Sequence, residues 1–180
     1  VTGGSGSIAG QQGYAAAHDG YTWLGDVAHT VSGWRTLGYA DLGWEDFYGF
    51  YAASSPYVLF VSGNSPYQTA QQLFDAMRGD PSMKWGNAGL GSINQLTGSL
   101  MLEKLGLKGN SVPYDGGRSA AIKVVAGEVT WSWCGLSDIL DLAQSGDIRI
   151  LGICDSSPRE IDCAKGNYTV PSLLDDYPEL

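Results

Sequence analysis

Basic side chains are scarce in this 180-residue sequence, and so are charged side chains in general. Charged residues make up 16% of the chain, and ten Lys and Arg residues stand against nineteen Asp and Glu residues, which gives a net charge of -9. A nucleic-acid partner is excluded because phosphate backbones require a basic surface, and an anionic membrane surface is disfavoured for the same reason. An apolar fraction of 43% with 11% aromatic residues excludes disorder and predicts a buried core.

Motifs of several enzyme classes are also missing. The sequence has no Gly-x-Ser-x-Gly nucleophile elbow, and no Lys is followed by Ser or Thr, so such hydrolases and P-loop nucleotide sites are excluded. The two histidines, His18 and His29, are eleven positions apart, with no Cys or carboxylate cluster at metal-ligand spacing. We therefore predict no catalytic residue, no metal and no cofactor.

Long apolar runs are absent, since the strongest short one, Tyr57–Val61, is far too short to cross a bilayer. The chain starts at Val1 inside a Gly/Ser stretch, which we interpret as a processed or truncated product. Cys154 and Cys163 are separated by a loop-like segment and could form a disulfide, or they could remain two thiols. Only the disulfide would indicate an oxidising compartment. The third cysteine, Cys134, has no obvious partner in the sequence.

Strand-like runs alternate with helical patterns from residue 55 onward. We expect strands at 57–62, 83–87, 111–114, 129–134 and 148–154, and helices at 68–78, 96–105, 120–125 and 137–143. Such βαβ units predict an α/β fold with a parallel-dominated five-stranded sheet covered by helices on both faces.

The first fifty residues follow a different pattern. We expect a helix at 8–17 and a strand at 21–24, but too few strands to close a sheet, as in an incomplete second lobe. The predicted division is a partial lobe with a crossover segment at 1–54, a complete lobe at 55–155 and a return segment at 156–180.

Two glycine-rich loops, Gly89–Ser92 and Gly116–Ser119, each follow a predicted strand and precede a predicted helix. In an open α/β sheet such loops lie at the carboxyl ends of the strands, where ligands bind. Bare backbone N–H groups and the positive end of the helix dipole favour a carboxylate or a phosphate there. Cys134-Gly135 marks a third position of this kind.

An alternative function is suggested by Gly4–Ala9, which fits the Gly-x-Gly-x-x-Gly/Ala pattern of NAD sites, with Asp26 located 22 residues after Gly4. That fingerprint requires an apolar strand directly before it, and only Val1-Thr2 precede it here. A glycine-rich loop leading into a helix is the favoured interpretation, and an NAD-dependent oxidoreductase is kept as the alternative.

Aromatic residues suggest a sugar-binding module, because Trp131 and Trp133 alternate on one predicted strand and share a face. Packing of that face under helices is the favoured explanation for this pair. Trp34 and Trp44 lie in an irregular segment and are harder to assign to a core.

Several segments, in order along the chain, resemble the substrate-binding receptors of tripartite tricarboxylate transporters, the Bug family. Residues 85–92 (Trp-Gly-Asn-Ala-Gly-Leu-Gly-Ser) resemble the Gly-x-Gly-Ser loop of the family, and residues 112–117 (Val-Pro-Tyr-Asp-Gly-Gly) resemble its Val-Pro-Tyr-Lys-Gly-Gly segment. Further similarity is found at 19–22, 46–47, 53–56, 127–129, 146–149 and 170–172.

The resemblance implies a monomeric periplasmic or cell-surface receptor with a type II periplasmic-binding-protein-like fold. Such a receptor closes two α/β lobes on a small organic acid and delivers it to a membrane permease. The resemblance places the ligand-binding residues at Gly25, Asp26, Val27 and Ala28 in one lobe and at Gly89, Gly91, Ser92, Ile93, Asn94, Gln95, Tyr114, Gly116, Gly117 and Cys134 in the other.

The sequence departs from the family pattern at several points. Gln95 stands where a His is common and Cys134 where an Asp is common, so the sequence does not predict which acid is bound. Family members begin with a strand and a Pro-Gly-Gly loop that contacts the ligand, and they end with a return to the first lobe. Both features are absent from this sequence. We therefore expect a fragment that binds ligand weakly or not at all.

Overall fold

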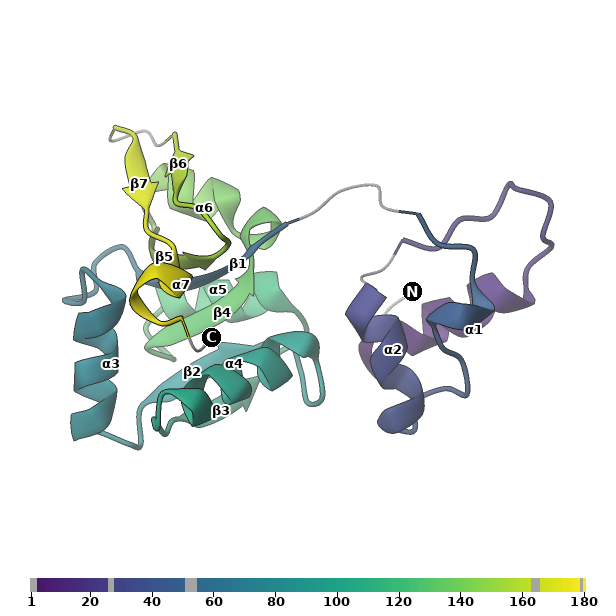
Figure 1. Ribbon diagram of the computed structural model, residues 1–180, viewed down its shortest axis with the longest axis horizontal. Coiled ribbons are helices and arrows are strands. Elements are labelled where there is room, and N and C mark those ends of the chain that lie inside the picture. Colours follow the sequence, from purple (N-terminus) through teal and green to yellow (C-terminus); the bar gives the residue numbers. More distant parts are fainter. Residues whose placement is uncertain (1–2, 26–27, 51–54, 163–165, 179) are drawn as a thin grey trace. The chain divides into compact units, whose positions relative to one another are not determined.

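The computed structural model describes residues 3–25, 28–50, 55–162, 166–178 and 180, which form two compact units (Figure 1). The smaller unit contains residues 1–54 together with 91–93, and the larger unit contains residues 55–90 and 94–180. In the described ranges, no helix has both the length and the apolar character needed to cross a membrane.

The larger unit is built on a five-stranded sheet with the strand order β3-β2-β4-β1-β5. Its strands are β1 (Tyr57–Ser62), β2 (Lys84–Asn87), β3 (Asn110–Pro113), β4 (Trp131–Gly135) and β5 (Ile148–Cys154). Strand β2 pairs in parallel with β3 and β4, whereas β1 lies between β4 and β5 and is antiparallel to both. Four strands therefore share one direction, and β1 alone opposes them.

The predicted α/β class and all five predicted strands are confirmed, but the expectation that β1 follows the parallel pattern is wrong. Apolar runs give the positions of strands without their directions. The chain passes from β1 through a helix to β2, yet β4 lies between these two strands in the sheet. Since β1 and β2 are not neighbours, the helix that joins them does not require them to be parallel.

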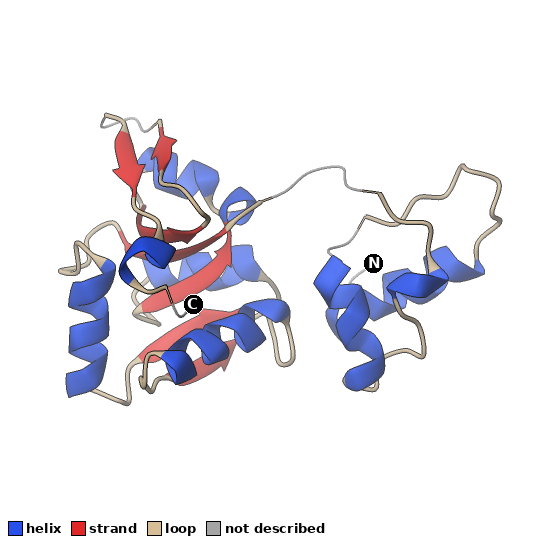
Figure 2. Ribbon diagram, viewed as in Figure 1, coloured by secondary structure: helices blue, strands red, loops and turns tan. Residues whose placement is uncertain are grey.

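Helices cover both faces of this sheet (Figure 2). They are α3 (Ala70–Gly79), α4 (Ile93–Lys104), α5 (Gly117–Val125), α6 (Leu140–Ser145) and α7 (Leu173–Asp176). Neighbouring residues of β1 point to opposite faces, so Leu59 and Val61 pack with α3 and α4, while Val58 and Phe60 pack with α5. Two apolar clusters therefore sandwich the sheet.

Local sequence signals explain where these helices begin and end. The hydroxyl of Thr69 caps α3 by accepting a hydrogen bond from the Gln72 N–H at 3.2 Å. Helix α6 ends at Gly146, which adopts the left-handed conformation with a φ of 83°. The helix predicted at 137–143 is shorter than expected, because a 3-10 turn, η3 (Leu136–Asp138), comes before α6.

The described residues after 155 belong to the larger unit, where β7 and α7 pack against β5. The antiparallel hairpin β6 (Arg159–Ile161) and β7 (Tyr168–Val170) leads to Pro171, whose carbonyl accepts a hydrogen bond from the Ile153 N–H at 3.0 Å. Cys163 lies outside the described residues, so the pairing of Cys154 with Cys163 stays open. The assignment of 156–180 to a return segment stays a prediction.

The smaller unit consists of η1 (Gly4–Gly6), α1 (Ser7–Ala15), α2 (Ala28–Thr36) and η2 (Trp44–Asp46). Its core is centred on Trp34, which is fully buried and donates its indole N–H to the Ser5 carbonyl at 2.9 Å. The predicted helix at 8–17 is confirmed. The strand predicted at 21–24 is wrong, because the described residues of this unit contain no strand with which it could pair.

Candidate functional site

The loops that the sequence predicts to bind ligand lie at one edge of the sheet in the larger unit. Asn87 at the end of β2 pairs with Pro113 at the end of β3, and Gly135 at the end of β4 pairs with Tyr57 at the start of β1. Because β2, β3 and β4 are parallel, the loops that follow them leave the sheet at this same edge. We refer to it as the sheet edge.

Asn87 organises the loop that follows β2. Its side chain is fully buried, and its amide nitrogen donates to the Ser111 hydroxyl at 2.8 Å and to the Val112 carbonyl at 3.1 Å. Its amide oxygen accepts from the N–H of Gly89 at 3.0 Å, where a φ of 115° favours glycine. Asn87 is not among the residues predicted from the sequence, although an Asn at the end of a strand, two residues before a glycine, is a recognisable turn signal.

The first turn of α4 is fixed to the neighbouring strands by Asn94. Asn94 is 7% exposed and donates to the Trp133 carbonyl at 3.2 Å, while its amide oxygen accepts from the Tyr57 hydroxyl at 3.5 Å. The amide of Gln95 lies 3.5 Å from the Ser111 hydroxyl, to which it donates. Both ends of the Asn94 side chain are therefore engaged within the larger unit.

The start of α5 depends on the absence of a side chain at Gly117. A Cβ atom at this position would lie 2.5 Å from Oδ2 of Asp138 and 3.1 Å from Cβ of Cys134. Tyr114 lies three residues earlier, and its N–H donates to the Asn87 carbonyl at 2.9 Å. The loop from Tyr114 to Gly117 is thus held against the ends of both β2 and β4.

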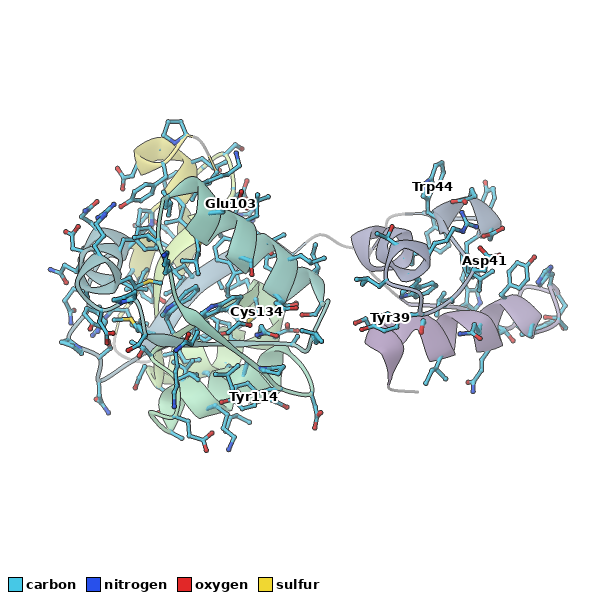
Figure 3. The ribbon with its side chains drawn as sticks, turned by 90° about the horizontal axis from the view of Figure 1, so that it is seen from below. Tyr39, Asp41, Trp44, Glu103, Tyr114 and Cys134 are labelled. Atoms are coloured by element: carbon cyan, nitrogen blue, oxygen red, sulfur yellow. The ribbon has the colours of Figure 1, made fainter. Side chains whose placement is uncertain are left out.

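Cys134 is fully buried at the end of β4, in the same unit as Tyr114 (Figure 3). Burial raises the pKa of its thiol, and the negative charge of Asp138 raises it further, so the thiol is neutral at physiological pH. A role for Cys134 in lining a ligand site stays a prediction.

Two further groups at the sheet edge have shifted pKa values. Burial raises the pKa of the Tyr57 phenol, and its electrostatic interactions with Cys134 and Asp138 raise it further. Partial burial also raises the pKa of Asp138, which the positive charge of Arg118 lowers in part. The guanidinium of Arg118 makes two bonds to Asp141, one of 2.7 Å between Nη2 and Oδ2 and one between Nη1 and Oδ1.

The structure covers the predicted residues of the smaller unit only in part. Gly25 lies in a loop, Asp26 and Val27 are outside the described residues, and Ala28 is the first residue of α2. Gly91, Ser92 and Ile93 are grouped with this unit. The ligand-binding assignment of all these residues stays a prediction.

Trp131 and Trp133 belong to the core, as we predicted from their alternation on one strand. Trp131 is fully buried and Trp133 is 4% exposed. The ring of Trp131 stacks on Trp85 with the centroids 5.0 Å apart and the planes at 10°. Neither indole offers an open face for stacking on a sugar.

Two hollows in the larger unit, of about 520 and 540 Å³, lie away from the predicted residues. The first is lined by Arg149, Tyr168 and Leu173, and the second by Trp85, Leu107 and Asn110, among others. Neither contains a predicted ligand-binding residue. The sheet edge remains the candidate site, because the loops that lead into α4 and α5 follow β2 and β3, whose carboxyl ends pair side by side there.

Comparison with known proteins connects this geometry to one family. Residues 2–161 match the family described as "Tripartite tricarboxylate transporter family receptor". No curated protein matches the chain.

Three solved structures have a similar fold. A periplasmic transporter has a TM-score of 0.81 and 20% identity, covering 98% of this chain and 59% of its own. A TctC solute binding protein from Polaromonas has a TM-score of 0.72 and 21% identity, covering 97% and 59%. MatC from Rhodopseudomonas palustris with bound malate has a TM-score of 0.74 and 19% identity, covering 95% and 65%.

The chain thus spans about three fifths of the length of these structures. Their similarity confirms the predicted periplasmic-binding-protein-like fold class.

Proposed function

Because the chain belongs to the tripartite tricarboxylate transporter receptors, a family of solute-binding proteins rather than enzymes, we propose that it captures a small carboxylate for such a transporter. The protein would work outside the cytoplasm as a monomer and deliver the ligand to a membrane permease. The family match over residues 2–161 carries this proposal. The family resemblance of the sequence motifs is thereby confirmed.

The sheet edge supports carboxylate binding without any basic side chain. The loop that begins at Gly89 leads into α4, and Gly116 and Gly117 lead into α5, so the starts of two helices are directed to this edge. Each helix start carries about half a positive charge and N–H groups without intrahelical partners. A protein with a net charge of -9 can hold a small anion in this way.

The engaged side chain of Asn94 refines the proposed role of this residue. Its amide is bonded to Trp133 and Tyr57, so we expect its backbone N–H, rather than its side chain, to face the ligand. Gln95, Tyr114 and the backbone of residues 89–93 would complete the contacts from this side. Residues Gly25 to Ala28 would contribute from the smaller unit.

The alternative, an NAD-dependent oxidoreductase, has less support. The Gly4–Ala9 segment forms η1 and the start of α1, and in the described residues 3–25 no strand accompanies it. A dinucleotide site requires the glycine-rich turn to connect a strand to a helix. The observed segment does not meet that requirement.

A thermal-shift screen of mono-, di- and tricarboxylates on the full-length protein tests the proposed function. The melting temperature should rise with the concentration of at least one carboxylate, because a ligand that binds only the folded state stabilises it. C4 dicarboxylates should be screened first, since MatC holds malate. A rise with NAD and silence across all carboxylates would contradict the proposal.

A pair of variants locates the binding site. Gln95→Ala should weaken binding, because Gln95 lies in the first turn of α4 at the sheet edge. Gln144→Ala on α6 changes the same side chain at an exposed position and should leave the affinity unchanged. Equal affinities for both variants would show that the binding site does not include the first turn of α4.

A further inference from the structure

The hollow of about 520 Å³ in the larger unit lies beside β5, the end strand of the sheet. It is lined by the first four residues of β5 and by residues of α3, α6, β7 and α7, all labelled in Figure 1. Ile148 at the start of β5 pairs with Ser62, whereas Cys154 at its end pairs with Tyr57 at the sheet edge. The hollow therefore adjoins the part of β5 that is remote from the sheet edge.

Arg149 supplies the only positive charge among the described residues that line this hollow. Its side chain is half-buried, and its Nη1 atom donates to the main-chain carbonyls of Ser65 and Tyr67 at 3.3 and 3.5 Å. The side-chain amide of Gln68, which also lines the hollow, donates to the same Ser65 carbonyl at 3.3 Å. Since both groups reach one oxygen atom, the guanidinium lies next to Gln68 at the end of the hollow that α3 lines.

Arg149 has no acidic partner in the part of the chain that the structure describes. The other arginines of the sequence each form an ion pair with a carboxylate, and these are Arg35, Arg78, Arg118 and Arg159. With nineteen acidic residues against ten basic ones, the lack of a carboxylate beside Arg149 is an exception in this protein. Both contacts of its guanidinium use Nη1, so Nη2 and Nε keep their hydrogens for a ligand.

The first turn of α3 adds two donors to this end of the hollow. The Thr69 hydroxyl caps the N–H of Gln72, whereas the N–H groups of Ala70 and Gln71 have no hydrogen-bond partner among the described residues. Ala70 and Gln71 both line the hollow, and Ala70 is only 6% exposed. These amides support a site that is defined by the hollow and by Arg149.

Most of the remaining lining is apolar and consists of Ile148, Ile150, Leu151, Pro171 and Leu173. A cation at one end of an apolar hollow fits an anion that carries an apolar body, and binding sites for small molecules have volumes of about 300–1,000 Å³. Asp176 also lines the hollow, and its negative charge disfavours a ligand with a second carboxylate.

We propose that this hollow is a second binding site, separate from the sheet edge, which takes small monocarboxylates with an apolar body and holds their carboxylate at Arg149. A guanidinium matches a carboxylate with charge-assisted hydrogen bonds, and the apolar walls take up the rest of the ligand. A neutral ligand lacks the charge, and a dicarboxylate must place its second charge among apolar side chains, which is costly. The site does not depend on the receptor function proposed above.

Three probes with six carbon atoms test the proposal by NMR titration of the full-length protein. Hexanoate, hexan-1-ol and adipate carry one, no and two carboxylates, and their affinities are read from the backbone amide signals of Ala70 and Gln71. Hexanoate should bind at least about tenfold more tightly than either of the others, because it alone combines one charge with an apolar chain. Equal affinities for hexanoate and hexan-1-ol, or hexanoate shifts confined to Gly89 and Ser92 at the sheet edge, would overturn the proposal.

Two variants assign the carboxylate to Arg149. Arg149→Gln removes the charge but keeps a side-chain N–H donor for the carbonyls of Ser65 and Tyr67, and its affinity for hexanoate should fall about tenfold. Arg78→Gln on α3 makes the same change at an exposed arginine that pairs with Asp75, and it should leave the affinity unchanged. An unchanged affinity in Arg149→Gln would overturn the assignment.

The outcomes are decisive in the unmodified protein and separate from the proposed function. The comparison of the three probes needs no variant, so it stands even if Arg149→Gln does not fold. Hexanoate that fails to bind at the hollow would contradict this site and leave the receptor function standing. Hexanoate binding there, with silence across the carboxylates at the sheet edge, would support this site and contradict the receptor function.

Discussion

In the larger unit, both faces of a five-stranded sheet are covered by apolar clusters, whereas the described core of the smaller unit is centred on Trp34. The larger unit buries its biggest side chains, including Phe60 and Phe74. The smaller unit leaves Trp23 70% exposed and Tyr48 98% exposed. Each strand of a sheet can bury apolar side chains on both of its faces. Two short helices can bury only the faces on which they pack together.

This contrast indicates that the two units differ in how their stability is distributed. In the larger unit, many side chains share the burial, so the loss of one leaves most contacts in place. In the smaller unit, α1 and η1 both depend on contact with one indole ring, through Gly10 and Ser5. The two units should therefore respond to substitution separately.

The largest expected effect is that of Trp34→Ala. Truncating a fully buried Trp costs about 3–5 kcal/mol, and here it also removes the hydrogen bond to Ser5. Hydrogen exchange should show loss of protection in α1 and α2, with the sheet of the larger unit still protected. An equal loss of protection in both units would show that they do not unfold separately.

A smaller effect is expected from Gly10→Ala in α1. The new methyl group would overlap the ring of Trp34, so the smaller unit should lose about 1–3 kcal/mol. Gly13→Ala is the matched control on the same helix, because its methyl group would meet Leu24 at an ordinary 3.5 Å. This control should be neutral or stabilise α1 by up to about 1 kcal/mol, as measured by urea unfolding.

In the larger unit, Thr69→Ala should cost about 1 kcal/mol. The substitution removes the hydroxyl that caps α3, and the N–H of Gln72 then loses its partner. Thr69→Ser keeps the cap and should retain the stability of the natural protein. A loss in the Ser variant as large as in the Ala variant would assign the effect to the Thr methyl group instead.

The smallest expected effect is a pH dependence that comes from Asp138. Its pKa is raised in the folded state, so the folded state holds the proton more tightly, and stability falls as pH rises through that pKa. Asp138→Asn should remove this loss and be slightly more stable than the natural protein at pH 7. Denaturant unfolding below about pH 3, where Asp138 is protonated in both states, should show the smallest difference.

Much of the larger unit could be predicted from the sequence, because its signals are local. Continuous apolar runs located all five strands, and the run at 148–154 coincides with β5. The glycines at 89 and 116 lie in the loops that precede α4 and α5, and Gly117 is the first residue of α5. The order of these motifs along the chain was enough to indicate the family.

The smaller unit was harder to predict, because its signals depend on partners. Residues 21–24 have the composition of a strand, but a strand requires a neighbour and the described residues of this unit offer none. Trp34 could not be assigned to a core from its irregular surroundings, yet it is the residue around which the unit packs.

The sequence by itself determined the positions of the strands, the loops at their ends and the family, because apolar periodicity and glycine turns act over a few residues. Only the tertiary structure decided that β1 runs against its neighbours and that the side chain of Asn94 is engaged by Trp133 and Tyr57. It alone brought the carboxylate of Asp138 to Gly117, 21 residues earlier in the chain. Strand direction and contacts of this range depend on how separate elements pack together, which no local pattern records.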